Sequence, residues 1–189
     1  MRKQTLDDVY KARLKIKSDI SEHMELLSRL ASLCENVTEF GVRDGNSTIA
    51  FLHGTPKTLT SYDINRFQRK NAYLKFAKVH GVEFTFVQAD TLKIQPIPRT
   101  DLLFFDTQHT YDQLAAELKI HANQVSKFLV FHDTSIFGDH GRGGQKGIWP
   151  AIAEFLKENS FWLLWLYSTQ NNGLAVLRKE QKSFKTNES

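Results

Sequence analysis

The sequence has one cysteine, no long apolar run and no internal repeat. Cys34 has no partner for an internal disulfide, and one thiol is too few for a cysteine-based metal site, so we interpret it as a small apolar residue near a helix end. No stretch approaches the ~18–20 apolar residues of a membrane span, and no apolar segment follows the opening Met-Arg-Lys-Gln-Thr. These absences predict a soluble protein of the reducing cytoplasm without a membrane partner.

A large excess of charge of one sign is also absent. The chain has 25 Lys and Arg against 21 Asp and Glu, and the two signs are interspersed outside residues 178–182. This pattern gives little support for a nucleic-acid partner. The 189 residues, 41% of them hydrophobic, suit one compact domain with a substantial core and leave no room for a second.

A glycine loop follows the first strand-like run, residues 37–40. The pattern is E-x-G-x-x-x-G, formed by Glu39, Gly41 and Gly45, whereas a dinucleotide site requires G-x-G-x-x-G. A carboxylate at the start of the loop would repel a phosphate and favour a cationic ligand. The glycines would let such a ligand approach the backbone closely.

Two later strand-like runs also end in acids. Asp63 comes 18 residues after Gly45, close to the ~20-residue offset at which an acid meets ribose hydroxyls in nucleotide-binding units. Asp90 follows the run at 82–87. A single acid after a strand is as often a solvated residue or a helix cap. Three such acids in register favour a nucleotide-like ligand.

These motifs resemble those of the class I S-adenosylmethionine-dependent methyltransferases. The resemblance implies that S-adenosylmethionine is the cofactor, with Glu39 near its positive charge, Asp63 at the ribose and Asp90 beside the adenine amino group. The cofactor-binding residues that it implies are Glu39, Gly41, Asp44, Gly45, Ser47, Asp63, Asp90 and Asp106.

The apolar runs predict a doubly wound α/β sheet. Strand-like runs end near Phe40, Asp63, Val87, Asp106 and Asp133, and they alternate with helical stretches at 47–53, 66–80 and 111–126. After a helix at 150–158, the runs 161–167 and 174–177 predict a hairpin. The resemblance covers residues 35–178 and implies a Rossmann-like, seven-stranded, mostly parallel sheet with an antiparallel last strand and helices on both faces.

The flanking segments are predicted to differ from this domain. Residues 1–34 show roughly helical apolar spacing, so they form one or two helices that either pack on the domain or build a homo-oligomer. Residues 179–189 are a polar tail that we expect to be disordered.

Two buried-type strands each deliver an acid and a histidine. The first ends in Asp106, with His109 three residues later, and the second ends in His132 and Asp133. The carboxyl ends of neighbouring parallel strands lie ~5 Å apart at one edge of a sheet, so both acids can face a single crevice. Two carboxylates and an imidazole suit Mg²⁺ or Mn²⁺. We therefore predict a metal site of Asp106, His132 and Asp133.

This arrangement resembles a subgroup of O-methyltransferases that act on sugars and antibiotics, including those named for likeness to cephalosporin hydroxylases. In that subgroup the acids at these two positions hold the metal. The subgroup often has a glycine and a second acid where this chain has Thr107 and Gln108. Without a metal, His109 can accept a hydroxyl proton, because the reference pKa of histidine is ~6.5. His109 and Asp106 are the predicted catalytic residues.

Other roles remain open for the same residues. His109 can cap a helix, His132 can be a core histidine, and Asp133 can satisfy backbone donors of the next loop. The glycine-rich segment at 135–147 is either an ordinary loop or a mobile substrate lid in which Arg142 or Lys146 meets an anionic group.

We predict transfer of a methyl group from S-adenosylmethionine to a hydroxyl of a small-molecule acceptor. One alternative is a nucleotide-cofactor oxidoreductase, which the E-x-G-x-x-x-G pattern and the antiparallel last strand disfavour. A nucleic-acid methyltransferase is disfavoured because residues 106–109 lack the expected proline-rich run. A non-catalytic S-adenosylmethionine-binding protein is an alternative that the sequence does not separate from an enzyme.

Overall fold

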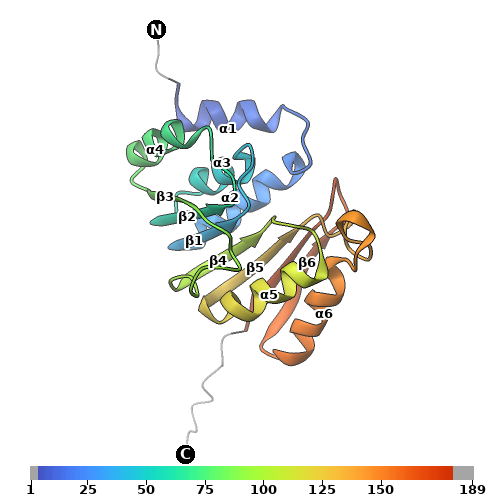
Figure 1. Cartoon of the computed structure of the whole chain (residues 1–189). Coiled ribbons are helices and arrows are strands. Elements are labelled where there is room, and N and C mark those ends of the chain that lie inside the picture. Colours follow the sequence, from blue (N-terminus) through green and yellow to red (C-terminus); the bar gives the residue numbers. More distant parts are fainter. Residues whose placement is uncertain (1–3, 181–189) are drawn as a thin grey trace, which may run out of the picture.

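The structure is a computed structural model that describes residues 4–180. Its centre is one seven-stranded sheet with the order β3-β2-β1-β4-β5-β7-β6 (Figure 1). All neighbouring strands are parallel except those that pair with β7, which runs antiparallel to both β5 and β6. The strands are β1 Asn36–Phe40, β2 Thr58–Asp63, β3 Glu83–Gln88, β4 Thr100–Phe105, β5 Val125–His132, β6 Trp162–Ser168 and β7 Leu174–Lys179. The predicted doubly wound sheet with an antiparallel last strand is confirmed.

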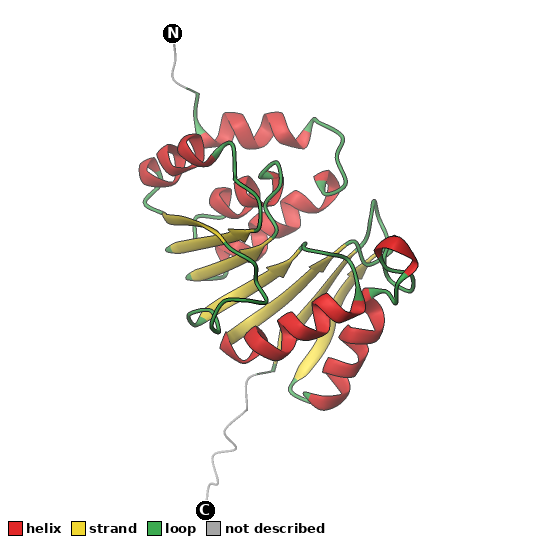
Figure 2. Ribbon diagram, in the orientation of Figure 1, coloured by secondary structure: helices red, strands yellow, loops and turns green. Residues whose placement is uncertain are grey.

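Helices cover both faces of the sheet (Figure 2). Four helices pack through one apolar cluster on the first face, and two pack through a second cluster on the opposite face. The first group is α1 Leu6–Leu14, α2 Met24–Ser32, α3 Asn46–His53 and α4 Lys70–Val79, and the second is α5 Tyr111–His121 and α6 Ile148–Glu158. Short 3₁₀ helices lie at Ser21–His23, Ala122–Gln124 and Arg142–Gly144.

The central strands are apolar on both faces because both faces are covered. Successive side chains of a strand point to opposite sides. On β4, the ring of Phe104 therefore packs against Phe51 of α3, with centroids 5.4 Å apart, while that of Phe105 stacks on Phe131 on the other side. This double burial fixes the register of β4 and β5 and so the position of the polar residues that follow them.

Two predicted helices have different limits in the structure. The stretch 66–80 becomes helical only at Lys70, because the preceding residues form a turn. The stretch 111–126 ends as an α-helix at His121, since Val125 already begins β5. At the start of α5, Thr110 caps the helix, with its side chain accepting a hydrogen bond from the Gln113 amide.

The N-terminal segment packs on the chain's own core. Met24, Leu27 and Leu30 of α2 are almost fully buried in the cluster that contains α3. Homo-oligomer formation through this segment stays a prediction, with Ile16 left 54% exposed. Cys34 is buried as expected, and burial raises the pKa of its thiol to about 12.

The C-terminal strand passes the predicted domain end by one residue, reaching Lys179. The predicted disordered tail falls mainly on residues 181–189, which lie outside the described part of the chain. Within residues 4–180, no helix combines the length and apolar character needed to cross a membrane.

Candidate functional site

A cleft of about 460 Å³ lies at the carboxyl ends of β1 to β4. This is the edge at which open α/β sheets bind ligands. The cleft is within the size range of small-molecule sites, roughly 300–1,000 Å³. It is lined by residues 41–43, 62–65, 89–91 and 106–109, together with Gln113 and Arg142. The structure therefore brings Gly41, Asp63, Asp90, Asp106 and His109 to one surface, as the sequence predicted.

The two glycines of the loop after β1 are required by the chain itself. Gly41 has φ +86°, and a Cβ atom there would lie 2.0 Å from the carbonyl oxygen of Asp106. Gly45 has φ +79°, and its Cβ would collide with the rings of Phe67 and Tyr73. Gly41 lines the cleft, whereas Gly45 lies outside the lining and begins α3. Close packing against β4 and α4 explains these glycines before any ligand is considered.

Glu39 lies beneath this loop and does not line the cleft. Its side chain is fully buried and accepts hydrogen bonds from Ser47, Thr48 and Ser61. Burial raises the pKa of Glu39 to about 7, although the three hydroxyl donors favour the ionised form and oppose the shift. Glu39 therefore joins β1, β2 and the first turn of α3. Its predicted contact with a positive charge of the donor stays a prediction, as does that of Ser47.

Asp63 supports the loop as well as facing the cleft. One carboxylate oxygen accepts hydrogen bonds from the amides of Val42 (2.8 Å) and Arg43 (3.0 Å), and the other accepts one from Asn65. Asp63 thus connects the end of β2 to the glycine loop. The predicted ribose contact would use the remaining lone pairs of the same carboxylate.

Asp90 and Asp44 lie differently. Asp90 lines the cleft, and a hydrogen bond from the Leu92 amide, with Lys93 3.1 Å away, lowers the pKa of its carboxyl. Asp44 is exposed and lies outside the lining. Its cofactor contact is untested.

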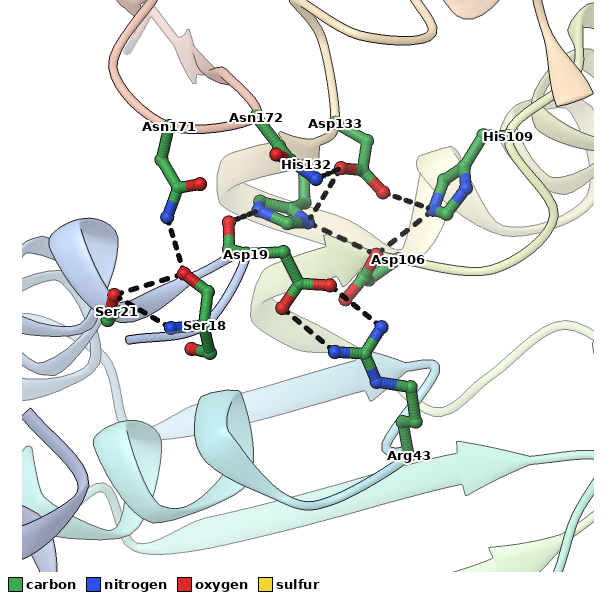
Figure 3. A network of polar contacts seen from close by, with 10 residues as sticks. All are labelled: Ser18, Asp19, Ser21, Arg43, Asp106, His109, His132, Asp133, Asn171 and Asn172. Atoms are coloured by element: carbon green, nitrogen blue, oxygen red, sulfur yellow. Dashed lines mark hydrogen bonds and ion pairs between the residues drawn. The ribbon is translucent and has the colours of Figure 1, made fainter. Parts of the chain in front are cut away.

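The acids and histidines predicted from β4 and β5 form one cluster (Figure 3). Nε2 of His109 lies 2.7 Å from Asp133 and 3.1 Å from Asp106. Nδ1 of His132 lies 3.3 Å from Asp106 and 3.6 Å from Asp133. Ligand atoms of Asp106, His109 and Asp133 lie within 4.8 Å of one another, so this candidate metal group has His109 where the sequence predicted His132.

The charges in this cluster balance one another. Burial would lower the pKa of His109, but its hydrogen bonds to Asp106 and Asp133 outweigh burial and raise that pKa to about 9. Burial would raise the pKa of Asp106, but hydrogen bonds from His109 and His132 hold it well below its usual value. The positive charge of His109 therefore lies between two carboxylates, a place that equally suits a metal cation.

His132 is held by a segment that sequence reasoning missed. We call residues 15–20, between α1 and the first 3₁₀ helix, the N-terminal strap. The carbonyl of Asp19 accepts a hydrogen bond of 2.9 Å from Nε2 of His132, and its carboxylate pairs with Arg43 at 2.7 Å (Figure 3). The strap thus connects the glycine loop with the end of β5. No local pattern in the sequence indicates these contacts.

A metal ion fits the chemistry of this donor set. Metal-binding histidines usually donate their second ring N–H to a carbonyl or carboxylate. His132 does so through Nε2 to Asp19, which in the neutral imidazole leaves the Nδ1 lone pair toward Asp106 and Asp133. Nδ1 of His109 is buried and has no hydrogen-bond partner within residues 4–180. Asp106 and Asp133 can therefore be joined as ligands by Nε2 of His109 or by Nδ1 of His132.

A buried acid beneath the cleft was also missed. Glu117 of α5 is fully buried and accepts hydrogen bonds from Thr91, Thr107 and Gln113, all of which line the cleft. Its only sequence signal is an acid on the inward face of a helix. Glu117 therefore connects the segment after β3 with the segment after β4 on the inner side of the cleft.

Comparisons with known proteins identify the fold. No family model and no curated protein matches the sequence. Solved structures do match: the N-methyltransferase NodS from Bradyrhizobium japonicum has a TM-score of 0.59 at 17% identity, covering 86% of this chain and 97% of its own. The chain has the class I methyltransferase fold.

Two further structures with this fold match over nearly the whole chain. The O-methyltransferase from Bacillus cereus in complex with SAH has a TM-score of 0.60 at 12% identity and covers 95% of this chain and 92% of its own. The O-methyltransferase TomG from Streptomyces achromogenes, in complex with SAM, has a TM-score of 0.58 at 18% identity and covers 96% of this chain and 100% of its own. At these identities, the likeness concerns the fold.

Proposed function

We propose that this protein is an S-adenosylmethionine-dependent methyltransferase that methylates a hydroxyl group of a small-molecule acceptor with the help of a divalent metal ion. The observation that carries the proposal is a single cleft that holds both halves of the reaction. The glycine loop, Asp63 and Asp90 lie along one part of it, and Asp106 and His109 along the next. Solved structures with the same fold include complexes with this donor and its demethylated product.

The donor side is assigned to the loop and the first three strands. Asp63 takes the ribose, Asp90 the adenine amino group, and Gly41 the donor's methionine part. These carboxylates already accept backbone hydrogen bonds that fix their orientation. Because their positions are set before binding, little side-chain freedom is lost when the donor binds.

The acceptor side is assigned to the cluster at the ends of β4 and β5. Bound S-adenosylmethionine supplies an electrophilic methyl group, and a bound divalent ion lowers the pKa of the acceptor hydroxyl. Asp106, Asp133 and His132 would hold the ion. The charge of the ion beside Asp106 and Asp133 would lower the raised pKa of His109, so that its neutral imidazole could accept the hydroxyl proton. Asp106 orients both histidines through its contacts at 3.1 and 3.3 Å. Orientation of two bound reactants contributes on the order of 7–11 kcal/mol.

Binding of the donor product is the decisive test. Calorimetry with S-adenosylhomocysteine should show binding to the whole chain, and Asp63→Asn should weaken it roughly tenfold or more, because a charged hydrogen bond is lost. Asp112→Asn, an exposed acid on α5, is the matched control and should bind normally. If NAD binds and S-adenosylhomocysteine at millimolar concentration does not, the proposal is wrong. Binding without transfer to any hydroxyl compound would favour the non-catalytic alternative.

A further inference from the structure

Arg142 is a cation of the cleft that has no acidic partner within residues 4–180. Its side chain is exposed and lines the same cleft as Asp106 and His109. Among the residues that the structure describes, no carboxylate lies within ion-pair distance of its guanidinium group. An unpaired guanidinium at a ligand site is available to an anion.

The other cations near the site are already paired. Arg43 lies 2.7 Å from Asp19. Lys146, on the same loop as Arg142, lies 3.4 Å from Glu154 and 3.6 Å from the centre of the Tyr111 ring. Unlike Arg43 and Lys146, Arg142 forms no ion pair with a carboxylate of residues 4–180.

The acids of the cleft are also engaged elsewhere. Asp63 accepts backbone amides of the glycine loop, Asp90 pairs with Lys93, and Asp106 contacts His109 and His132. None of the three compensates the charge of Arg142, so a ligand that brings a negative charge would be the first to do so.

The backbone of Arg142 is fixed beside the proposed proton acceptor. Its amide donates a hydrogen bond of 3.0 Å to the carbonyl of His109. Gly141 packs so closely that a Cβ atom would lie 2.7 Å from the same carbonyl oxygen. The guanidinium thus extends from a point next to His109, on the acceptor side of the cleft.

We propose that the acceptor carries an anionic oxygen group, a carboxylate or a phosphate, and that Arg142 binds it. The planar guanidinium can hold two oxygens of such a group at once, which places the rest of the acceptor, with its hydroxyl, toward His109 and Asp106. This inference rests on the proposed methyl transfer. It narrows the substrate class to hydroxylated organic anions.

The experiment compares matched acceptors that differ in charge. Protocatechuate is paired with its neutral amide, and a glucose monophosphate with glucose, so that the two pairs separate carboxylate from phosphate binding. Methyl transfer from labelled S-adenosylmethionine is measured for the unmodified chain, Arg142→Gln, Arg142→Lys and Lys146→Gln. Lys146→Gln is the matched control, because it removes a cation from the same loop that lies outside the cleft lining.

We expect the charged member of at least one pair to have a kcat/KM about tenfold or more above that of its neutral partner. Arg142→Gln should abolish this preference mainly by raising KM, Arg142→Lys should restore part of it, and Lys146→Gln should keep it. Equal rates for charged and neutral members of both pairs, or a preference that survives Arg142→Gln, would overturn the proposal.

Donor binding separates this proposal from the proposed function. S-adenosylhomocysteine affinity should be equal in the unmodified chain and Arg142→Gln, and a tenfold loss in the variant would assign Arg142 to the donor instead. If no acceptor of either pair is methylated, calorimetry on the S-adenosylhomocysteine-loaded protein decides. Equal or absent binding of charged and neutral members then rejects the anion site while the donor site stands.

Discussion

The side chain of Asn172 donates a hydrogen bond of 2.7 Å to Asp133, across 39 positions of sequence. Asn172 belongs to the turn between β6 and β7, and Asp133 directly follows β5 with φ +60°, a conformation that is uncommon for a residue other than glycine. The carbonyl of Asn172 also accepts the Ser135 amide at 2.9 Å. The β6–β7 turn therefore holds the strained acid of the candidate metal site in place.

Asn172→Ala should lower kcat by roughly 10- to 100-fold, the usual cost of removing a partner that orients a metal ligand. S-adenosylhomocysteine affinity should not change, because the donor residues lie on other strands. Steady-state kinetics and calorimetry measure the two effects. Asn123→Ala, an exposed amide after α5, is the control and should leave both unchanged. Normal kcat in Asn172→Ala would mean that Asp133 needs no support from this turn.

Asp133→Asn should remove Mn²⁺ binding and lower turnover by about 10²-fold or more, since a charged metal ligand becomes a neutral one. Donor affinity should stay within about twofold of the unmodified chain. His132→Gln should weaken Mn²⁺ binding, whereas His109→Gln should lower turnover and retain the ion. Anomalous scattering from Mn²⁺-soaked crystals locates the ion. Activity that survives exhaustive chelation, with no peak between these side chains, would exclude the metal and leave His109 as the base, with a rate that rises toward its raised pKa of about 9.

Glu39 should make the stability of the protein fall between about pH 4.5 and 7. Its folded pKa of about 7 lies above the ordinary value of 4.5, so the folded chain binds more protons than the unfolded chain in this window. The loss in the free energy of unfolding is absent below this pH window and complete above it. It then reaches about 3 kcal/mol, because each pKa unit is worth about 1.4 kcal/mol.

Urea unfolding at pH 5 and pH 8, compared between the unmodified chain and Glu39→Gln, measures this effect. The free energy of unfolding of Glu39→Gln minus that of the unmodified chain should be roughly 2–3 kcal/mol larger at pH 8 than at pH 5. Glu83→Gln, an exposed acid on β3, should show no such gain. Parallel pH profiles for Glu39→Gln and the unmodified chain would show that Glu39 stays ionised in the folded protein.

Gly41→Ala should destabilise the fold by more than its backbone conformation explains. The positive φ costs an alanine roughly 1–2 kcal/mol, and the contact with the Asp106 carbonyl adds about 1–3 kcal/mol of overpacking. Gly81→Ala is a matched control, because Gly81 has φ +72° with open space around its Cβ position. Thermal or urea unfolding gives both values. If both variants lose the same free energy of unfolding, the close contact at Gly41 contributes nothing to the destabilisation.

Much of the fold was predictable because its signals are local. Runs such as Leu102–Phe105 and Phe128–Phe131 are apolar at every position, and this pattern indicates strands covered on both faces. The hairpin at the end followed from a polar turn that contains Gly173. The limits of α4 and α5 were less predictable, since a helix end depends on which backbone groups the neighbouring chain satisfies.

The candidate site also has a part that the sequence predicted and a part that only the structure shows. The sequence placed Asp63, Asp106 and Asp133 at strand ends, because a strand's end can be recognised from its own residues and parallel strands share one edge. It interpreted Glu39 as a ligand contact, which stays a prediction, but it did not indicate that this side chain is buried under the loop among three hydroxyls. Which way a polar side chain points is decided by the groups that surround it in three dimensions.

The sequence by itself determined the alternation of strands and helices, the C-terminal hairpin and the acids at the strand ends, since each depends on periodicity and spacing within a short segment. The antiparallel last strand was implied by the family resemblance. Only the tertiary structure decided that the strap at Asp19 holds His132 and that Asn172 holds Asp133. It also decided that Arg142 lies beside His109 without an ion pair to any residue of the described range 4–180. These contacts join positions up to 113 residues apart. No local pattern encodes them, because the free energy of such a contact depends on the packing of the whole chain that brings the two groups together.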